Sequence, residues 1–318
     1  MKYVFGPVSS KRLGQSLGVD LLPMKRCTWN CLYCQLGSSA FHTVKREEFF
    51  PKEEILEEIR QALQKPVRFD WITFVGSGET LLYKGLDWLI AGAASLTSVP
   101  VAVITNGSLL IEPEVRRELL GAAGVLPSLN AGSEALHERI CRPAAGFTFA
   151  AHVEGLCAFR KEYSGKLWIE VMLIGGLNDT DAALYDLAAT LSLIKPDMVH
   201  LVLPTRPAAE PGLLMPSSER TERAIAILSE AAPVIHPLKG NMDLGGAEDL
   251  LESVTAIVSR HPVQQTELLD ALARRSIRSG EQVDTLLASL LASNRFRVVT
   301  YNDDSHWTIA DGSGSVPP

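Results

Sequence analysis

The sequence predicts an α/β fold in which an open six-strand βα barrel precedes a small C-terminal winged helix-turn-helix domain. Two observations predict the barrel. Between residues 19 and 231, β-rich runs alternate with helical runs, and turn residues with polar side chains follow the β-rich runs. Such alternation is typical of a parallel sheet covered by helices. A third observation, helical runs followed by a hairpin pattern after residue 248, predicts the second domain.

The composition is that of a folded globular protein. Of 318 residues, 46% are hydrophobic and 21% are charged, which excludes a largely disordered chain. The net charge of −7 provides no basic field for nucleic acid or an anionic membrane. The N-terminus carries no apolar signal region, and the apolar stretch 168–177 is too short to span a bilayer and contains Glu170. We therefore expect a soluble cytoplasmic protein without membrane contact.

The predicted elements follow from local patterns. In the first helical run, Ile55, Leu56, Ile59 and Leu63 recur at helical spacing after an acidic first turn. Strands are predicted at residues 19–22, 69–75, 99–105, 124–129, 166–174 and 198–203. Helices are predicted at residues 52–63, 86–96, 113–123, 149–162, 181–193 and 217–231, and then at 248–259, 265–273 and 281–292.

Three of the five cysteines, Cys27, Cys31 and Cys34, lie within eight residues just after the first predicted strand. Clustered thiols of this kind indicate a metal site, either an iron–sulfur cluster or zinc. Zinc needs a fourth ligand, for which His42 is the candidate near in sequence. A disulfide cannot use three cysteines evenly, and nothing in the chain indicates secretion.

Polar residues also occupy the carboxyl ends of the later strands, where sites in such sheets lie. They are Gly76, Ser77, Gly78 and Glu79 after the second strand, Asn106 after the third, Ser128 and Asn130 at the fourth, Asn178 after the fifth and Arg206 after the sixth. Each is also an ordinary turn residue when considered alone. Lys11 and Arg12, between turn formers, fit a solvated loop as well as contact with an anionic ligand.

The spacing C-x3-C-x2-C, with Tyr33 before the last cysteine, resembles the signature of the radical S-adenosylmethionine (radical SAM) superfamily. The resemblance implies a 4Fe-4S cluster bound by Cys27, Cys31 and Cys34, with S-adenosylmethionine on the open iron. Reductive cleavage would then give a 5′-deoxyadenosyl radical that abstracts hydrogen from a substrate. It also implies a small electron-donor protein of the flavodoxin or ferredoxin type.

The same resemblance assigns the strand-end residues. The run from Gly76 to Glu79 is similar to the motif that contacts the methionine amino group, because glycines admit close approach and a carboxylate attracts an ammonium. The implied cofactor-binding residues are Tyr33, Gly76, Ser77, Gly78, Glu79, Asn106, Ser128 and Asn130. Asn178 and Arg206 are candidates for substrate contact.

Further stretches, including 5–8, 13–20 and Arg142-Pro143, are similar to the wybutosine-synthesising branch of that superfamily, which modifies tRNA. Members of that branch carry a second cluster on cysteines that this chain lacks before Cys27. The substrate class therefore stays open, with RNA or protein among the candidates. Two other hypotheses are an activase that installs a glycyl radical and a winged-helix regulator that senses through its cluster.

The predicted domains are a barrel over residues 1–240, a winged-helix domain over 245–312 and a flexible tail over 313–318. Between Arg260 and Asp311 there are six arginines and seven acidic residues. Because nucleic-acid affinity depends largely on phosphate neutralisation, this balance argues against strong binding to duplex DNA. We expect the second domain to pack on the barrel or on a protein partner.

Overall fold

The structure is a computed structural model that describes residues 1–310 except 11, 39–41, 66, 237–243 and 245–248. Its centre is an eight-stranded sheet whose strands follow chain order. Strands β2 to β8 are parallel, whereas β1 pairs antiparallel with β2. The strands are β1 (Val4–Ser10), β2 (Gly14–Asp20), β3 (Trp71–Val75), β4 (Val101–Thr105), β5 (Gly124–Pro127), β6 (Lys166–Met172), β7 (Met198–Val202) and β8 (Val234–Ile235).

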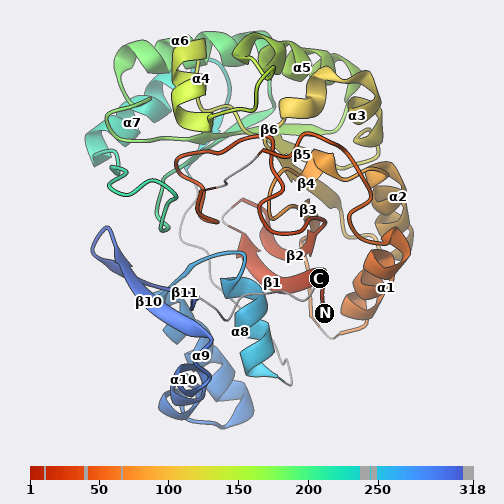
Figure 1. Cartoon of the computed structure of the whole chain (residues 1–318), viewed down its shortest axis with the longest axis vertical. Helices are drawn as coiled ribbons and strands as arrows, with labels where there is room; N and C mark the ends of the chain where they lie inside the picture. The colour runs from red at the N-terminus through yellow and green to blue at the C-terminus, as the bar shows by residue number, and fades with distance from the viewer. Residues whose placement is uncertain (11, 39–41, 66, 237–243, 245–248, 311–318) are drawn as a thin grey trace.

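Helices lie along the outer side of this sheet, so that it forms a partial barrel (Figure 1). They are α1 (Lys52–Leu63), α2 (Leu86–Leu96), α3 (Pro113–Glu118), α4 (Glu134–Cys141), α5 (Phe149–Glu162), α6 (Asp181–Ile194) and α7 (Ser218–Leu228), with 3-10 turns η1 (Thr80–Leu82) and η2 (Ser108–Ile111). Helix α1 buries Ile55 and Ile59, as its periodicity predicts. Among the described residues, no helix is long and apolar enough to cross a membrane.

Strand side chains alternate between the two sides of the sheet. In β6, Leu167, Ile169 and Val171 are fully buried in the main core that the outer helices share. Trp168 faces the opposite way and lies edge to face with Trp71 of β3, with 5.6 Å between the ring centroids. The inner face of the barrel is therefore lined by alternate residues of each strand, a register used below.

The predicted fold class is confirmed, and the six predicted strands correspond to β2 through β7. The sequence analysis missed β1 and began β2 too late. Gly6 and Pro7 look like a turn, but the strand absorbs them at an irregularity between Phe5 and Val8. It also missed the short edge strand β8 and helix α4, which is only eight residues long.

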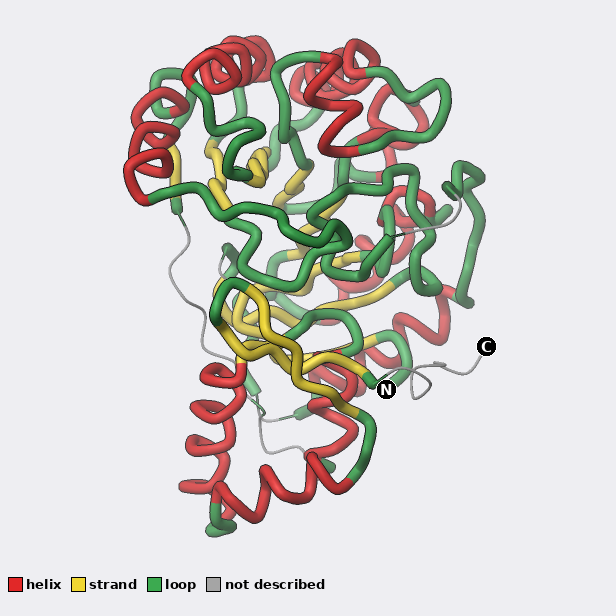
Figure 2. The backbone as a smooth tube through the Cα atoms, turned by 60° about the vertical axis from the view of Figure 1, so that its left-hand side comes forward, coloured by secondary structure: helices red, strands yellow, loops and turns green. Residues whose placement is uncertain are grey.

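The C-terminal segment forms α8 (Leu250–Val258), α9 (Gln265–Ser279), α10 (Val283–Ala292) and a three-stranded antiparallel sheet. Its strands are β9 (Val263–Gln264), β10 (Phe296–Tyr301) and β11 (Asp304–Ile309). This segment has its own hydrophobic core around Trp307, and Figures 1 and 2 show it apart from the helix-covered side of the barrel, near β1. The predicted limits at 240, 245 and 312 and the tail 313–318 fall on or next to residues outside the described part, as does Lys11, and they stay predictions.

The C-terminal segment packs directly on the barrel. Arg260 donates to the Asp20 carboxylate at the end of β2 over 2.8 Å. His306, which is fully buried, forms a hydrogen bond of 3.0 Å with the carbonyl oxygen of Thr205 in the loop after β7. The expected packing of this segment on the barrel is thus observed between described residues.

Candidate cluster and cofactor site

The three clustered cysteines lie on the loop that follows β2, and all are free thiols of intermediate exposure. Burial, with the neighbouring thiols and Glu79, raises the pKa of Cys27. A hydrogen bond with Cys141, followed by burial, raises the pKa of Cys31. Ionisation of these thiols in the metal-free chain is thus opposed by their surroundings. A cationic iron centre would supply the missing compensation, because bound metal stabilises thiolate.

The thiol loop is held against the turn after β3 by main-chain bonds. Lys25 N–H donates to the Ser77 carbonyl over 2.6 Å, and Glu79 N–H donates to the Arg26 carbonyl over 2.7 Å. Arg26 and Gly78 form an isolated parallel bridge. A Cβ atom on Gly78 would lie 1.7 Å from the Arg26 carbonyl oxygen. Glycine at this position therefore lets the first cysteine stand beside the glycine-rich turn.

We expect Gly78→Ala to displace the thiol loop, because the contact is with rigid backbone. The variant should lose about 1–3 kcal/mol of unfolding free energy and most of its capacity to bind iron after reconstitution. Iron analysis and urea unfolding measure both effects. Gly121→Ala is the matched control, since its added Cβ would meet only Ile90 Cγ2 at 3.5 Å. Normal iron binding by Gly78→Ala would contradict the role given to this contact.

Glu79 reaches the site as predicted, but its carboxylate is already bonded within the chain. It is fully buried and accepts hydrogen bonds from Leu81 N–H at 3.0 Å, Asn106 N–H at 2.6 Å and the Thr105 hydroxyl. Burial raises its pKa to about 7 despite these donors. Glu79 thus joins the ends of β3 and β4, a role that the sequence analysis did not foresee for it.

Two asparagines connect further strand ends to the thiol loop. Asn106 Nδ2 donates to Thr28 Oγ1 over 2.9 Å and lies 3.8 Å from Cys27 Sγ. Asn130 Nδ2 donates to the Tyr33 hydroxyl over 2.7 Å, while its Oδ1 accepts from the main chain of β6. Both side chains therefore lie within reach of the three thiols or of their loop.

Ser77, Gly76 and Ser128 occupy the expected strand ends. Ser77 donates its main-chain N–H and its hydroxyl to the Asp20 carboxylate, with the N–H bond at 2.8 Å. A Cβ atom on Gly76 would lie 2.6 Å from Leu22 Cδ1, so the Leu22 side chain would have to shift to admit a larger residue. Ser128 bridges to Glu170 of β6. These residues shape the site through the main chain.

Asn178 does not fit the role of substrate contact. It is 1% exposed, and its two Nδ2 protons go to the carbonyl oxygens of Asn130 and Met172 over 2.9 and 2.8 Å. Its Oδ1 accepts from Ile174 N–H over 2.7 Å. With both donors used, Asn178 ties the end of β5 to the turn after β6. This expectation is corrected, because a side chain saturated by backbone groups has no donor for a ligand.

Arg206 lies beside the thiol loop. Its Nη1 donates to Gln35 Oε1 over 3.0 Å, and Gln35 directly follows Cys34. Neither Gln35 nor Cys141 was among the residues predicted for the site. Cys141 ends α4, is fully buried, and lies 3.8 Å from Asn130 Nδ2 as well as next to Cys31. The adjacent Arg142-Pro143 pair was the available signal, since Pro143 bridges to Trp29 of the thiol loop.

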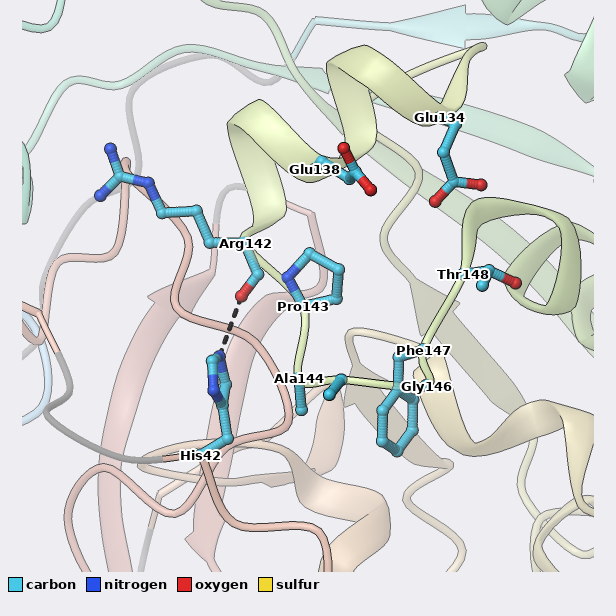
Figure 3. A pocket seen from close by; sticks show the side chains of 10 residues that line it. His42, Glu134, Glu138, Arg142, Pro143, Ala144, Gly146, Phe147 and Thr148 are labelled. Atoms are coloured by element: carbon cyan, nitrogen blue, oxygen red, sulfur yellow. Dashed lines mark hydrogen bonds between the residues drawn. The ribbon is translucent and has the colours of Figure 1, made fainter.

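A surface pocket of about 370 Å³ lies beside Arg142 and Pro143. In Figure 3 its wall carries the carboxylates of Glu134 and Glu138 from α4, and the ring of His42 bonds the Arg142 carbonyl oxygen. Apart from His42, none of the residues predicted to bind the cluster, the cofactor or the substrate lines it. His42 is thus directed to a backbone oxygen, which weakens the zinc hypothesis that needed it as a fourth ligand.

The donor set fits an iron–sulfur cluster with three protein ligands. Three free thiols on one loop are surrounded by apolar residues such as Trp29, Leu32 and Ile174, and thiolates are the usual cluster ligands. Within the described part of the chain, no three Cys, His, Asp or Glu side chains already converge on one point. Side-chain rotation on this loop would therefore have to accompany binding.

Comparison with protein families gives one match, to the model described as "Radical SAM superfamily", over residues 21–188. UPF0026 protein MJ1312 of Methanocaldococcus jannaschii is 30% identical over 87% of this chain and 88% of that protein. A protein of Brachyspira hyodysenteriae named GTPase Obg is 36% identical over 93% of this chain, which spans only 43% of that protein's length. A UPF0026 protein of Synechocystis is 38% identical over 64% of this chain and 76% of its own length.

Two solved structures share the fold. A radical SAM methyltransferase from Sphaerobacter thermophilus superposes with a TM-score of 0.55 at 19% identity, over 70% of this chain and 66% of that chain. TYW1 with a lysine-pyruvate adduct bound gives a TM-score of 0.55 at 17% identity, over 72% and 76%. At these identities the similarity concerns the fold alone.

Proposed function

The chain belongs to the radical SAM superfamily and, within it, to the UPF0026 family, and from this premise we propose that it is a radical SAM enzyme acting through one cluster. Superfamily membership implies a 4Fe-4S cluster and S-adenosylmethionine. When bound, these groups supply a one-electron cleavage that yields a 5′-deoxyadenosyl radical. In this proposal Cys27, Cys31 and Cys34 hold the cluster, and hydrogen is abstracted from a substrate inside the barrel.

The observation that carries the proposal is the convergence of strand ends on the thiol loop. The turn after β3 binds its backbone through Gly78, the end of β4 contacts it through Asn106, and the end of β5 contacts it through Asn130. A structural metal site needs only its ligands. Polar groups from successive strand ends around one loop instead favour a bound small molecule beside the metal.

The chain's own residues would bind and shield that molecule. The glycines at 76 and 78 leave backbone carbonyl groups approachable. The amides of Asn106 and Asn130 are bonded within the chain, to Thr28 and Ser108 and to Tyr33 and Met172, and they hold the thiol loop beside that molecule. Glu79 positions the β4 turn, as its three internal hydrogen bonds require. Buried Trp29 and Leu32 exclude water from the thiols.

The finer assignment to the wybutosine-related branch also belongs to this proposal. Its support is the similarity at residues 5–8, 13–20 and 142–143, together with the fold shared with TYW1. A flavodoxin or ferredoxin type of electron donor and a cytoplasmic location are the associated predictions. A cluster-based regulator is disfavoured, since it has no need of the strand-end groups. A glycyl-radical activase would use the same site on a protein substrate.

The test is anaerobic reconstitution of the full chain with iron and sulfide, followed by reduction with dithionite. We expect the EPR spectrum of the reduced cluster to change on addition of S-adenosylmethionine, and 5′-deoxyadenosine to form above a protein-free blank. Separate additions of tRNA, peptides and small metabolites then identify which class accelerates that release. A protein that binds zinc, or a reduced cluster unresponsive to S-adenosylmethionine, would contradict the proposal.

A further inference from the structure

The inner face of the barrel carries a charged group below the thiol loop. Glu170 of β6 and His200 of β7 are paired in register, and Glu170 lies on the inner side because its neighbours Ile169 and Val171 face the outer core. Arg12, from the turn between β1 and β2, forms an ion pair with Glu170. The Arg12 and Glu170 side chains are 23% and 16% exposed, so this charge pair is largely enclosed.

Three arginines lie around one residue of the C-terminal segment. Burial, followed by the nearby charges of Arg206, Arg12 and Arg260, holds the pKa of His261 well below its ordinary value. His261 is therefore neutral at pH 7 and contributes no charge. Burial and the proximity of Arg206 also lower the pKa of Arg12 to about 10. The arginines thus form one cluster of like charge within the protein.

Two of the three arginines form ion pairs with carboxylates. Glu170 pairs with Arg12, and Asp20 pairs with Arg260. Arg206 has no carboxylate within ion-pair distance among the described residues, and its one hydrogen bond there goes to the neutral amide oxygen of Gln35. The Glu267 carboxylate acts on Arg206 through its charge, but it makes no ion-pair contact with the guanidinium between described residues.

Two other enclosed arginines show which hydrogen-bond partners an arginine with a structural role has in this chain. Arg116 binds the carboxylate of Glu162 and two carbonyl oxygens. Arg46 binds Glu118 and two carbonyl oxygens. A guanidinium has five donors arranged for a carboxylate or phosphate. Arg206 is only partly buried and uses one of them between described residues, so its remaining donors are available to a ligand.

The C-terminal segment reaches this site through Gln35. Gln35 Nε2 forms hydrogen bonds with His261 Nδ1 over 2.6 Å and with the Arg260 carbonyl oxygen over 3.1 Å. The same amide accepts from Arg206 through its oxygen. Because Gln35 follows Cys34, this network places Arg206 next to the thiol loop and the C-terminal segment over it.

We propose that Arg206, with Arg12 beside it, binds an anionic group of the substrate, a carboxylate or a phosphate, inside the barrel next to the thiol loop. The C-terminal segment closes this site through His261 and Arg260. The inference rests on the proposed function, since it names a chemical class for that enzyme's substrate. Two observations on the described residues carry it: Arg206 has no ion-pair contact with a carboxylate, and most of its fork of donors is unused.

The experiment titrates the full-length, reconstituted protein with inorganic phosphate and, separately, with acetate in a calorimeter at low ionic strength. We expect saturable binding of at least one of them. Comparison of the two affinities shows whether the site prefers phosphate or carboxylate. Arg206→Gln should weaken it roughly 10- to 100-fold, the usual effect of losing a charged hydrogen bond. The anion affinity of Arg206→Lys should lie between those of Arg206→Gln and the unaltered protein, because lysine retains the charge without the fork of donors.

Arg60→Gln is the matched control, because Arg60 is 52% exposed and pairs with Glu57 on the surface of α1. It should bind the anion as the unaltered protein does. Melting temperatures of all variants report whether the C-terminal segment stays docked. The inference is wrong if Arg206→Gln binds the anion as tightly as the unaltered protein does. It is also wrong if neither protein binds the anion and Arg206→Gln melts at a lower temperature. Either result leaves Arg206 as a docking residue.

The proposed function is tested separately in the same samples, by the spectrum of the cluster and by background release of 5′-deoxyadenosine. If cleavage occurs but no anion binds, only the substrate class is wrong. If the anion binds but no cluster forms, the anion site stands and the enzyme proposal fails.

Discussion

Replacing Cys27, Cys31 or Cys34 by alanine should remove the cluster and reduce S-adenosylmethionine cleavage to background. A 4Fe-4S cluster with three protein ligands has no coordination to spare, and the loop contains no other thiol. The measurements are iron and sulfide per chain, the EPR spectrum of the reduced protein and 5′-deoxyadenosine release. We expect this loss of activity to be far larger than the loss caused by replacing a neighbouring residue that does not bind the cluster.

The structure adds two controls to this experiment. Cys157→Ala should keep the cluster, because Cys157 packs against the outer core on α5. Cys141 lies next to Cys31, so it is the described thiol able to replace it. If Cys31→Ala keeps iron, the double variant Cys31→Ala/Cys141→Ala should lose it. Retention of the cluster spectrum in the triple alanine variant of Cys27, Cys31 and Cys34 would refute the assignment.

Replacing Glu79 by alanine should destabilise the fold and weaken S-adenosylmethionine binding together. Three donors lose their acceptor, and each unsatisfied group costs about 1–3 kcal/mol, which gives about 3–9 kcal/mol if the costs add. Because Asn106 N–H is one of these donors, the turn that carries the Asn106 amide to Cys27 should loosen. Urea unfolding measures the stability, and equilibrium dialysis with labelled S-adenosylmethionine measures the affinity.

Two further variants separate the roles of Glu79. Glu79→Gln keeps an acceptor and should recover most of the stability. A double-mutant cycle with Thr105→Val isolates the bond between Glu79 and the Thr105 hydroxyl. If Glu79→Ala unfolds at the same urea concentration as the unaltered protein and binds S-adenosylmethionine normally, Glu79 neither positions the turn nor contacts the ligand.

Comparison of sequence and structure shows what residue patterns can predict at the site. The carboxylate after β3 and the amides after β4 and β5 lie near the thiol loop, and their contact with a ligand stays a prediction. The hydrogen-bond partners of these side chains within the chain were not predicted, because the sequence does not show whether a donor comes from a ligand or from the next strand. Glu79 and Asn178 are thus engaged by the chain itself. The sequence also does not indicate that Arg206 forms no ion pair with a carboxylate between described residues.

The sequence by itself determined the thiol spacing, the alternation of strands and helices and the fold class. Each depends on residues close together in the chain, where apolar periodicity and turn chemistry act directly. Only the tertiary structure decided that Asn130 meets Tyr33 across 97 residues and that Arg260 meets Asp20 across 240. Such partners are selected by packing and charge compensation in the folded chain, where segments far apart in the sequence come into contact.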